Sequence, residues 1–174
     1  MGDNGRGTVI VGASLAGLRV AEGLRKLGDT RPIDLFGAEP HLPYDRPPLS
    51  KSVLTAEQSA GDTQFRTADE LRERGIQLHL GEPARGLDTE RGLVMVGDAE
   101  VAFDQLVIAT GARARTIAGA DHLAGVHTIR TLDDALRIRH RLTSASHVVV
   151  IGAGFIGAEV ARRFLVGRVE AVEH

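Results

Sequence analysis

The sequence predicts an α/β fold that opens with a β-strand, a glycine-rich turn, a helix and a second strand. Three observations support this prediction. The β-branched run Thr8–Val11 is typical of a strand buried on both faces of a sheet. Apolar residues then recur at helical spacing from Leu18 to Leu27, and Gly28 is a suitable end for that helix. The same pattern returns near residue 147, as an internal repeat.

Between the two repeats, short strands alternate with short helices. A helix is predicted over Thr67–Arg74, with Thr67 as N-cap, Glu70 at the capping-box position and Gly75 just after its end. A second helix is predicted over Leu132–Leu142, with Thr131 as N-cap and a basic outer face that comprises Arg137, Arg139 and Arg141. Strands are predicted at Ile33–Phe36, Ile76–Leu80, Leu93–Val96, Val101–Phe103 and Leu106–Ala109.

The second repeat suggests two nucleotide-binding units in one chain. It is predicted to comprise a strand at His147–Ile151, a turn at Gly152–Gly157, a helix at Ala158–Val166 and a strand at Val169–Val172. We therefore expect a Rossmann-like domain over residues 1–111, a connection with a helix over 112–144, and the beginning of a second Rossmann-like domain over 145–174.

Composition excludes several classes of function. The net charge is −2 and aromatic residues make up 3% of the 174 residues, which argues against a nucleic-acid partner. There is no cysteine, so a thiolate metal site and a redox-active thiol pair are both excluded. Redox chemistry would have to come from a bound cofactor. No segment has the roughly 20 apolar residues of a membrane span, and we expect a cytoplasmic protein.

The second glycine motif has the full pattern of a dinucleotide-binding turn. Gly152 makes the tight turn, Gly154 lets the backbone approach a pyrophosphate, and Gly157 allows close packing of helix on strand. Glu173 follows the next predicted strand and would accept hydrogen bonds from a ribose, which favours NAD over NADP. The alternative is a plain buried turn between strand and helix.

The first glycine motif departs from that pattern at one position. Ser14 stands where the second glycine is expected, between Gly12 and Gly17. Its side chain could crowd a pyrophosphate, or its hydroxyl could donate to it. Asp34 lies inside the second strand and is interpreted as a solvated residue, so Glu39, just past the strand end, is the better candidate for the ribose.

A proline-rich loop from Glu39 to Lys51 is the most specific segment of the chain. Its prolines fix φ and remove conformational freedom. A rigid loop that carries Arg46 and Lys51 is suited to an anionic ligand. It could equally be a stiff surface loop with solvated charges.

Together, the loop Pro43–Lys51 and the motifs Gly12–Gly17, Ala109–Gly111, Arg130–Ala135 and Gly152–Gly157 resemble the FAD-dependent ferredoxin and rubredoxin reductases. These reductases belong to the pyridine nucleotide-disulfide oxidoreductase superfamily. The resemblance covers essentially the whole chain. It implies a flavoprotein that passes electrons from NADH through FAD to an iron–sulfur partner of the ferredoxin or rubredoxin type.

The resemblance also implies roles for individual residues. Lys51, near the flavin ring, and Glu159, near the nicotinamide, are the residues expected to take part in catalysis. FAD would be held by Gly12, Ser14, Leu15, Ala16, Gly17, Glu39, Arg46, Lys51, Ala109, Thr110 and Gly111. NAD(H) would be held by Gly152, Gly154, Phe155, Ile156, Gly157 and Glu173.

The sequence offers no metal site and no general acid–base catalyst. The seven histidines have no metal-binding spacing and are interpreted as solvated or loop residues. Hydride transfer requires the stacking of two rings rather than a side-chain base, so this agrees with the expected chemistry.

Relatives of this kind are more than twice as long, so we expect a truncated form without efficient NADH oxidation. The leading alternative is a non-catalytic nucleotide-binding fragment or gene remnant. An NAD-only dehydrogenase is disfavoured by the presence of two glycine motifs. Self-association through an exposed sheet edge near residue 172 is a further expectation.

Overall fold

The computed structural model describes residues 6–120, 122–145 and 147–168, and these fall into two compact units. The first unit comprises the described residues up to Asp45 together with Gln64–Ala112. The second unit comprises Arg46–Thr63 and the described residues from Arg113 onward. The predicted strand over residues 169–172, the edge near residue 172 and Glu173 lie outside the described residues.

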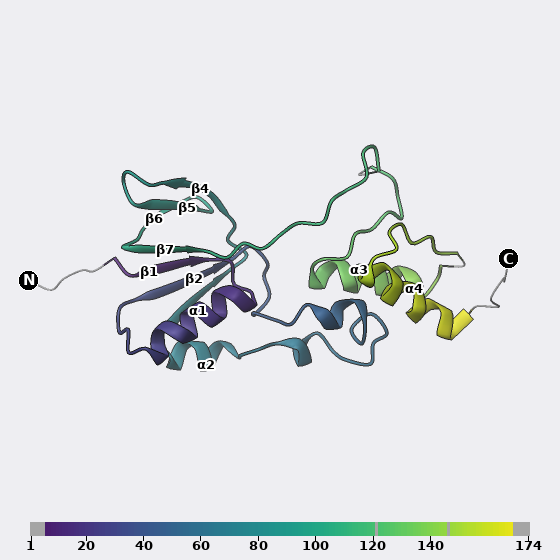
Figure 1. The fold of residues 1–174 in the computed structure, drawn as a ribbon, viewed down its shortest axis with the longest axis horizontal. Coiled ribbons are helices and arrows are strands. Elements are labelled where there is room, and N and C mark those ends of the chain that lie inside the picture. The colour runs from purple at the N-terminus through teal and green to yellow at the C-terminus, as the bar shows by residue number, and fades with distance from the viewer. Residues whose placement is uncertain (1–5, 121, 146, 169–174) are drawn as a thin grey trace, which may run out of the picture. The chain divides into compact units, whose positions relative to one another are not determined.

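A four-stranded parallel sheet is the centre of the first unit (Figure 1). Its order is β3-β2-β1-β7, formed by β3 (Ile76–Leu80), β2 (Ile33–Gly37), β1 (Thr8–Val11) and β7 (Gln105–Ile108). Thr8 is level with Ile33 on one side and with Gln105 on the other. All four residues of β1 are buried, as expected for a strand with a neighbour on each edge and a covered surface on each face.

The two faces of this sheet bury different partners because side chains alternate along each strand. One face carries Ile10, Ile33 and Leu35, which pack with Leu18 and Ala21 of α1 (Leu15–Lys26). Helix α2 (Ala68–Glu73) adds Leu71 to the same cluster. The other face is covered by a small antiparallel sheet, which gives the first unit three layers (Figure 1). The prediction of an α/β fold is confirmed.

The antiparallel sheet has the order β4-β5-β6 and differs from the prediction in two ways. Strand β5 (Leu93–Val96) agrees with the prediction, but β6 spans Ala99–Ala102, earlier than expected, because a tight turn pairs Val96 with Ala99. Strand β4 (Ala84–Asp88) was not predicted. Val94 and Val96 of β5 pack against Val9, Val11 and Phe36 of the parallel sheet.

Helix α1 begins earlier than its apolar repeat predicts. The glycine-rich segment was predicted as a turn up to Gly17, yet α1 starts at Leu15, so the last three residues of that segment form the first helical turn. The helix ends near the predicted stop, where Gly28 adopts a φ of +86°.

The capping box of α2 forms as predicted. The hydroxyl of Thr67 accepts a hydrogen bond from the Glu70 amide at 3.2 Å, and the Glu70 carboxylate accepts one from the Thr67 amide at 2.7 Å. We expect Thr67→Ala to lower the free energy of unfolding by about 1 kcal/mol, because an amide at the helix start loses its acceptor. Urea unfolding followed by circular dichroism measures this. Thr67→Ser keeps the hydroxyl and serves as the control; equal losses for both variants would contradict the capping role.

The second unit contains helix α3 (Leu132–Leu142), helix α4 (Phe155–Arg168) and two short 3₁₀ turns, Pro47–Ser50 and Gly61–Thr63. Helix α3 has the predicted bounds, and Thr131 and Asp134 form a reciprocal capping box at its start. Helix α4 starts at Phe155, three residues before the predicted helix, for the same reason as α1.

The strand predicted at His147–Ile151 is wrong. These residues have no strand conformation, and Val149 and Ile151 are 85% and 76% exposed. A strand requires a neighbour that accepts its backbone hydrogen bonds. Within the part of the chain that the structure describes, no strand pairs with this segment.

Candidate nucleotide-binding site

The turn after β1 requires glycine at its first position. Gly12 has a φ of +118°, and a Cβ there would overlap the carbonyl oxygen of Ala109. The amide of Gly12 donates to the carbonyl of Phe36 at 2.8 Å, and the amide of Ala109 donates to the carbonyl of Val11 at 2.7 Å. The backbones that follow β1 and β7 therefore meet the end of β2 at the carboxyl edge of the sheet, where ligands of open α/β sheets bind.

Gly17 allows α1 to pack directly against this turn. A Cβ at Gly17 would overlap the carbonyl oxygen of Gly12 and would lie 3.2 Å from Cγ2 of Ile10. The first intrahelical hydrogen bond is donated by the Leu18 amide to the Ser14 carbonyl at 2.9 Å, so the preceding amides have no helical acceptor. The Ser14 hydroxyl does not cap the helix. This helix start is suited to a phosphate group.

Glu39 lies just past the end of β2, as predicted. Its carboxylate accepts a hydrogen bond from the Tyr44 hydroxyl at 2.5 Å, and its backbone carbonyl accepts one from Gly81 at 3.1 Å. The proline-rich loop thus returns to the strand end and holds Glu39 in place. Glu39 is half-buried at this end of the sheet.

Asp34 is not the solvated residue that the sequence suggests. Its carboxylate lies 2.7 Å from Nε2 of His79, whose ring stacks on Phe36 with ring centroids 4.4 Å apart. His79 therefore belongs to β3 and to a packed face rather than to a solvated loop. Asp34 and Phe36 share a face of β2 because they are two residues apart, and β3 is the adjacent strand.

The segment Ala109–Gly111 follows β7 beside the first glycine turn. Ala109 is half-buried, Thr110 and Gly111 are exposed, and Gly111 has a φ of +69°. Two large apolar residues at the same end of the sheet are also exposed, Leu15 by 46% and Ile108 by 65%. Exposed apolar residues beside helix amides that have no acceptor within the helix are typical of a surface that binds a partly apolar ligand.

The second glycine turn has the geometry of the first. Gly152 has a φ of +113°, and a Cβ at Gly157 would overlap the Gly152 carbonyl oxygen, as at Gly17. The Ala158 amide donates to the Gly154 carbonyl at 3.0 Å, which matches Leu18 and Ser14. At Gly154 an added Cβ would meet nothing within 4 Å. Phe155 and Ile156, at the start of α4, are 93% and 53% exposed.

In the second unit, the proline-rich loop forms a 3₁₀ turn over Pro47–Ser50. The amides of Lys51 and Val53 both donate to the carbonyl of Pro48 at 3.0 Å, so the chain reverses over a few residues. Arg46, at the start of this turn, donates from Nη1 to the carbonyl of Arg130 at 2.7 Å. The structure therefore brings one of the two predicted loop cations against the connection that precedes α3.

The two residues expected to take part in catalysis lie together. Nζ of Lys51 is 3.4 Å from Oε1 of Glu159, and the Ser50 hydroxyl donates to Oε2 of the same carboxylate at 2.6 Å. The hydrogen bond from Ser50 is the main cause that holds the pKa of Glu159 below its ordinary value of 4.5, with Lys51 adding to the effect. Sequence reasoning did not single out Ser50, although it stands beside Lys51 in the proline-rich loop.

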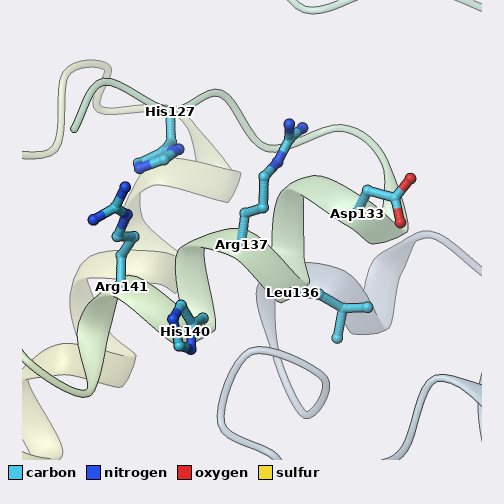
Figure 2. Close-up of a pocket in the computed structure, with 6 residues that line it drawn as sticks. All are labelled: His127, Asp133, Leu136, Arg137, His140 and Arg141. Atoms are coloured by element: carbon cyan, nitrogen blue, oxygen red, sulfur yellow. The ribbon is translucent and has the colours of Figure 1, made fainter. Parts of the chain in front are cut away.

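A hollow beside α3 contains none of the predicted cofactor-binding residues (Figure 2). Arg137 and Arg141 rise from α3 toward the connection that carries His127, whereas Leu136 and His140 point to the other side. The predicted basic face is correct for Arg137 and Arg141 but wrong for Arg139. Two residues along a helix correspond to a rotation of about 200°, and Arg139 donates instead to the Val53 carbonyl at 3.2 Å.

Among the described residues, no group of histidine, aspartate or glutamate side chains could hold a metal ion. In the same part of the chain, no helix is long and apolar enough to cross a membrane.

The model of the family described as "Pyridine nucleotide-disulphide oxidoreductase" matches residues 6–171. The chain belongs to this family. The resemblance inferred from the sequence is thereby confirmed.

Its relatives include reductases of oxygenase systems. The chain is 42% identical over 163 residues to the ferredoxin–NAD(+) reductase component of the p-cumate 2,3-dioxygenase system of Pseudomonas putida, covering 92% of this chain and 40% of that protein. It is 41% identical to rhodocoxin reductase of Rhodococcus erythropolis, covering 88% of this chain and 36% of the relative. Among solved structures, the covalent putidaredoxin reductase–putidaredoxin complex matches with a TM-score of 0.87 and 37% identity, over 92% of this chain and 40% of that one. This chain thus spans about 40% of the length of the relatives it matches.

Proposed function

We propose that this chain supplies the FAD-binding part, and the start of the NAD(H)-binding part, of a flavoprotein reductase that passes electrons from NADH to an iron–sulfur protein. The observation that carries the proposal is the repeated glycine turn. Gly12 and Gly152 share one backbone conformation, and Gly17 and Gly157 share one steric requirement. A reductase that moves electrons between two dinucleotides requires two such turns.

The pyrophosphate of FAD would be bound by the first glycine turn. The turn Gly12–Gly17, with Ser14, Leu15 and Ala16 at the helix start, offers amides to the phosphate oxygens, and Glu39 would accept the ribose hydroxyls. Ala109, Thr110 and Gly111 would close over the cofactor at the strand end. Arg46 and Lys51 would supply positive charge to the pyrophosphate and to the flavin ring.

NAD(H) would be bound by the second turn, through Gly152, Gly154, Phe155, Ile156 and Gly157, with Glu173 on the ribose. Glu159 would lie near the nicotinamide. When bound, the flavin would accept a two-electron hydride and release its electrons one at a time. The protein residues bind and orient the two rings and fix the charges beside them. The domain assignments to residues 1–111 and 145–174 form part of this proposal.

Reconstitution with flavin tests the proposal. The purified chain is incubated with FAD, passed through gel filtration, and its visible absorption spectrum is recorded. Retained flavin bands that bleach on anaerobic addition of NADH would support the reductase. Retained bands without bleaching would favour the non-catalytic nucleotide-binding alternative. A colourless protein that cannot be reconstituted would contradict the proposed FAD site.

We expect Glu39→Gln to weaken FAD binding about tenfold, because an amide accepts hydrogen bonds from a ribose less strongly than a carboxylate does. Quenching of flavin fluorescence measures the affinity. The control is Tyr44→Phe, which removes the hydrogen bond from the Tyr44 hydroxyl to Glu39 but keeps the carboxylate. If Tyr44→Phe weakened binding as much as Glu39→Gln, the loop rather than the carboxylate would be the contributing feature.

A further inference from the structure

Ser50 and Lys51 use different oxygens of one carboxylate. The Ser50 hydroxyl donates to Oε2 of Glu159 at 2.6 Å, and the Lys51 ammonium lies 3.4 Å from Oε1. A carboxylate held at both oxygens cannot rotate about its last side-chain torsion without losing one partner. The orientation of the Glu159 carboxylate is therefore set from the proline-rich loop.

The position of Ser50 is itself fixed. Ser50 is 6% exposed, whereas the side chains of Lys51 and Glu159 are 45% and 35% exposed. It is the last residue of the 3₁₀ turn that Pro47 and Pro48 begin. The Pro48 carbonyl accepts hydrogen bonds from the amides of Lys51 and Val53, which follow Ser50 and close the turn. Of the three side chains, the serine is therefore the rigid member, and the two charged residues are the more mobile ones.

We propose that Ser50 is a positioning residue for the Lys51–Glu159 pair. Its hydroxyl holds the carboxylate of Glu159 so that the other oxygen faces Lys51. This deepens the proposed function and depends on it for its catalytic meaning, because Lys51 is there assigned to the flavin ring and Glu159 to the nicotinamide. In this interpretation the rigid proline-rich loop fixes the position of the Ser50 hydroxyl as well as those of the cations Arg46 and Lys51.

The charges around Glu159 agree with this arrangement. Lys51 approaches from the loop, and Arg163 lies one turn further along α4, where it pairs with Glu57 at 3.6 Å. Both cations lower the pKa of Glu159, and the hydrogen bond from Ser50 is the largest single cause of that lowering. A surface ion pair alone is weak and adopts several geometries. A short hydrogen bond from a buried hydroxyl fixes the orientation of the carboxylate, which the ion pair alone does not.

Carbon-13 NMR of the full chain tests the proposal without any cofactor. The Glu159 side-chain carboxyl signal, assigned with Glu159→Gln, is followed against pH in the parent chain, in Ser50→Ala and in Ser50→Thr. We expect the pKa of Glu159 to rise in Ser50→Ala and to return to the parent value in Ser50→Thr, which keeps the hydroxyl. A loss of packing alone would move the unfolding midpoint but not this pKa. Should Ser50→Ala lose its dispersed amide spectrum, Ser50→Cys replaces it, since a thiol is only a weak donor.

An unchanged Glu159 pKa in Ser50→Ala would overturn the positioning role, particularly if Lys51→Met raised that pKa in the same assay. The result is separable from the reductase proposal. If the chain fails to bind FAD but its Glu159 pKa depends on Ser50, the positioning role stands and the proposed function is contradicted. If the chain binds FAD but its Glu159 pKa does not depend on Ser50, the proposed function stands and the positioning role is contradicted.

Discussion

Gly17→Ala is expected to lower the free energy of unfolding by about 1–3 kcal/mol and to impair FAD binding with it. The new Cβ would overlap the carbonyl oxygen of Gly12, which is backbone and has little freedom to move. Relief requires α1 to shift away from β1, and this shift displaces the helix amides proposed to meet the pyrophosphate. Urea unfolding and flavin-fluorescence quenching measure the two effects on one sample.

Gly23→Ala is the matched control in the same helix. An added Cβ at Gly23 would meet nothing within 4 Å, and alanine is the better helix former, so this variant should gain about 0.5–1 kcal/mol. The two glycine-to-alanine changes are therefore expected to have opposite signs. A Gly17→Ala chain as stable as Gly23→Ala would mean that the close approach of helix and turn is absent in solution.

Leu35→Ala is expected to lower the free energy of unfolding by about 2–5 kcal/mol. Leu35 is fully buried in β2, in the cluster that joins the parallel sheet to α1 and α2, so its truncation leaves a cavity as well as losing apolar burial. A loss of this size is a large fraction of the stability of a typical domain. The expected measurement is a lower urea midpoint at an unchanged slope.

Leu27→Ala provides the comparison for that loss. Leu27 is 86% exposed at the end of α1, so removing the same atoms from it should change the free energy of unfolding by less than about 0.5 kcal/mol. Similar losses for Leu27→Ala and Leu35→Ala would show that Leu35 is not packed in the core cluster.

The sequence predicts those elements of the first unit whose side-chain pattern is strong. Strand β1 is a continuous β-branched run, β2 is mostly apolar, and β3 alternates apolar with polar residues. Helix α2 is bounded by a capping box and Gly75. Strand β4 has the sequence Ala-Arg-Gly-Leu-Asp, which lacks β-branched residues and alternation. Its pairing with β5 is irregular between Ala84 and Gly86, and it depends on a neighbouring strand that local patterns do not reveal.

The site was predictable where backbone conformation demands a residue type. Gly12 and Gly17 are required by steric overlap, and that requirement is what the motif encodes. The pairing of Asp34 with His79 and that of Ser50 with Glu159 join residues 45 and 109 positions apart. Neither spacing leaves a local pattern, so these contacts follow from the tertiary fold alone. At His147–Ile151 a local pattern is present but the predicted strand is not. An apolar run forms a strand only where a neighbouring strand accepts its hydrogen bonds.

The central place of β1 has a consequence for synthesis on the ribosome. One edge of β1 pairs with β2, which emerges soon after it, but the other edge pairs with β7, where Thr8 is level with Gln105. At about 5–20 residues per second, the second edge would wait several seconds for its partner. During that time an apolar strand with open backbone groups is exposed to other nascent chains. The long interval between β1 and β7 thus makes the nascent first unit a candidate for chaperone protection until its last strand has left the exit tunnel.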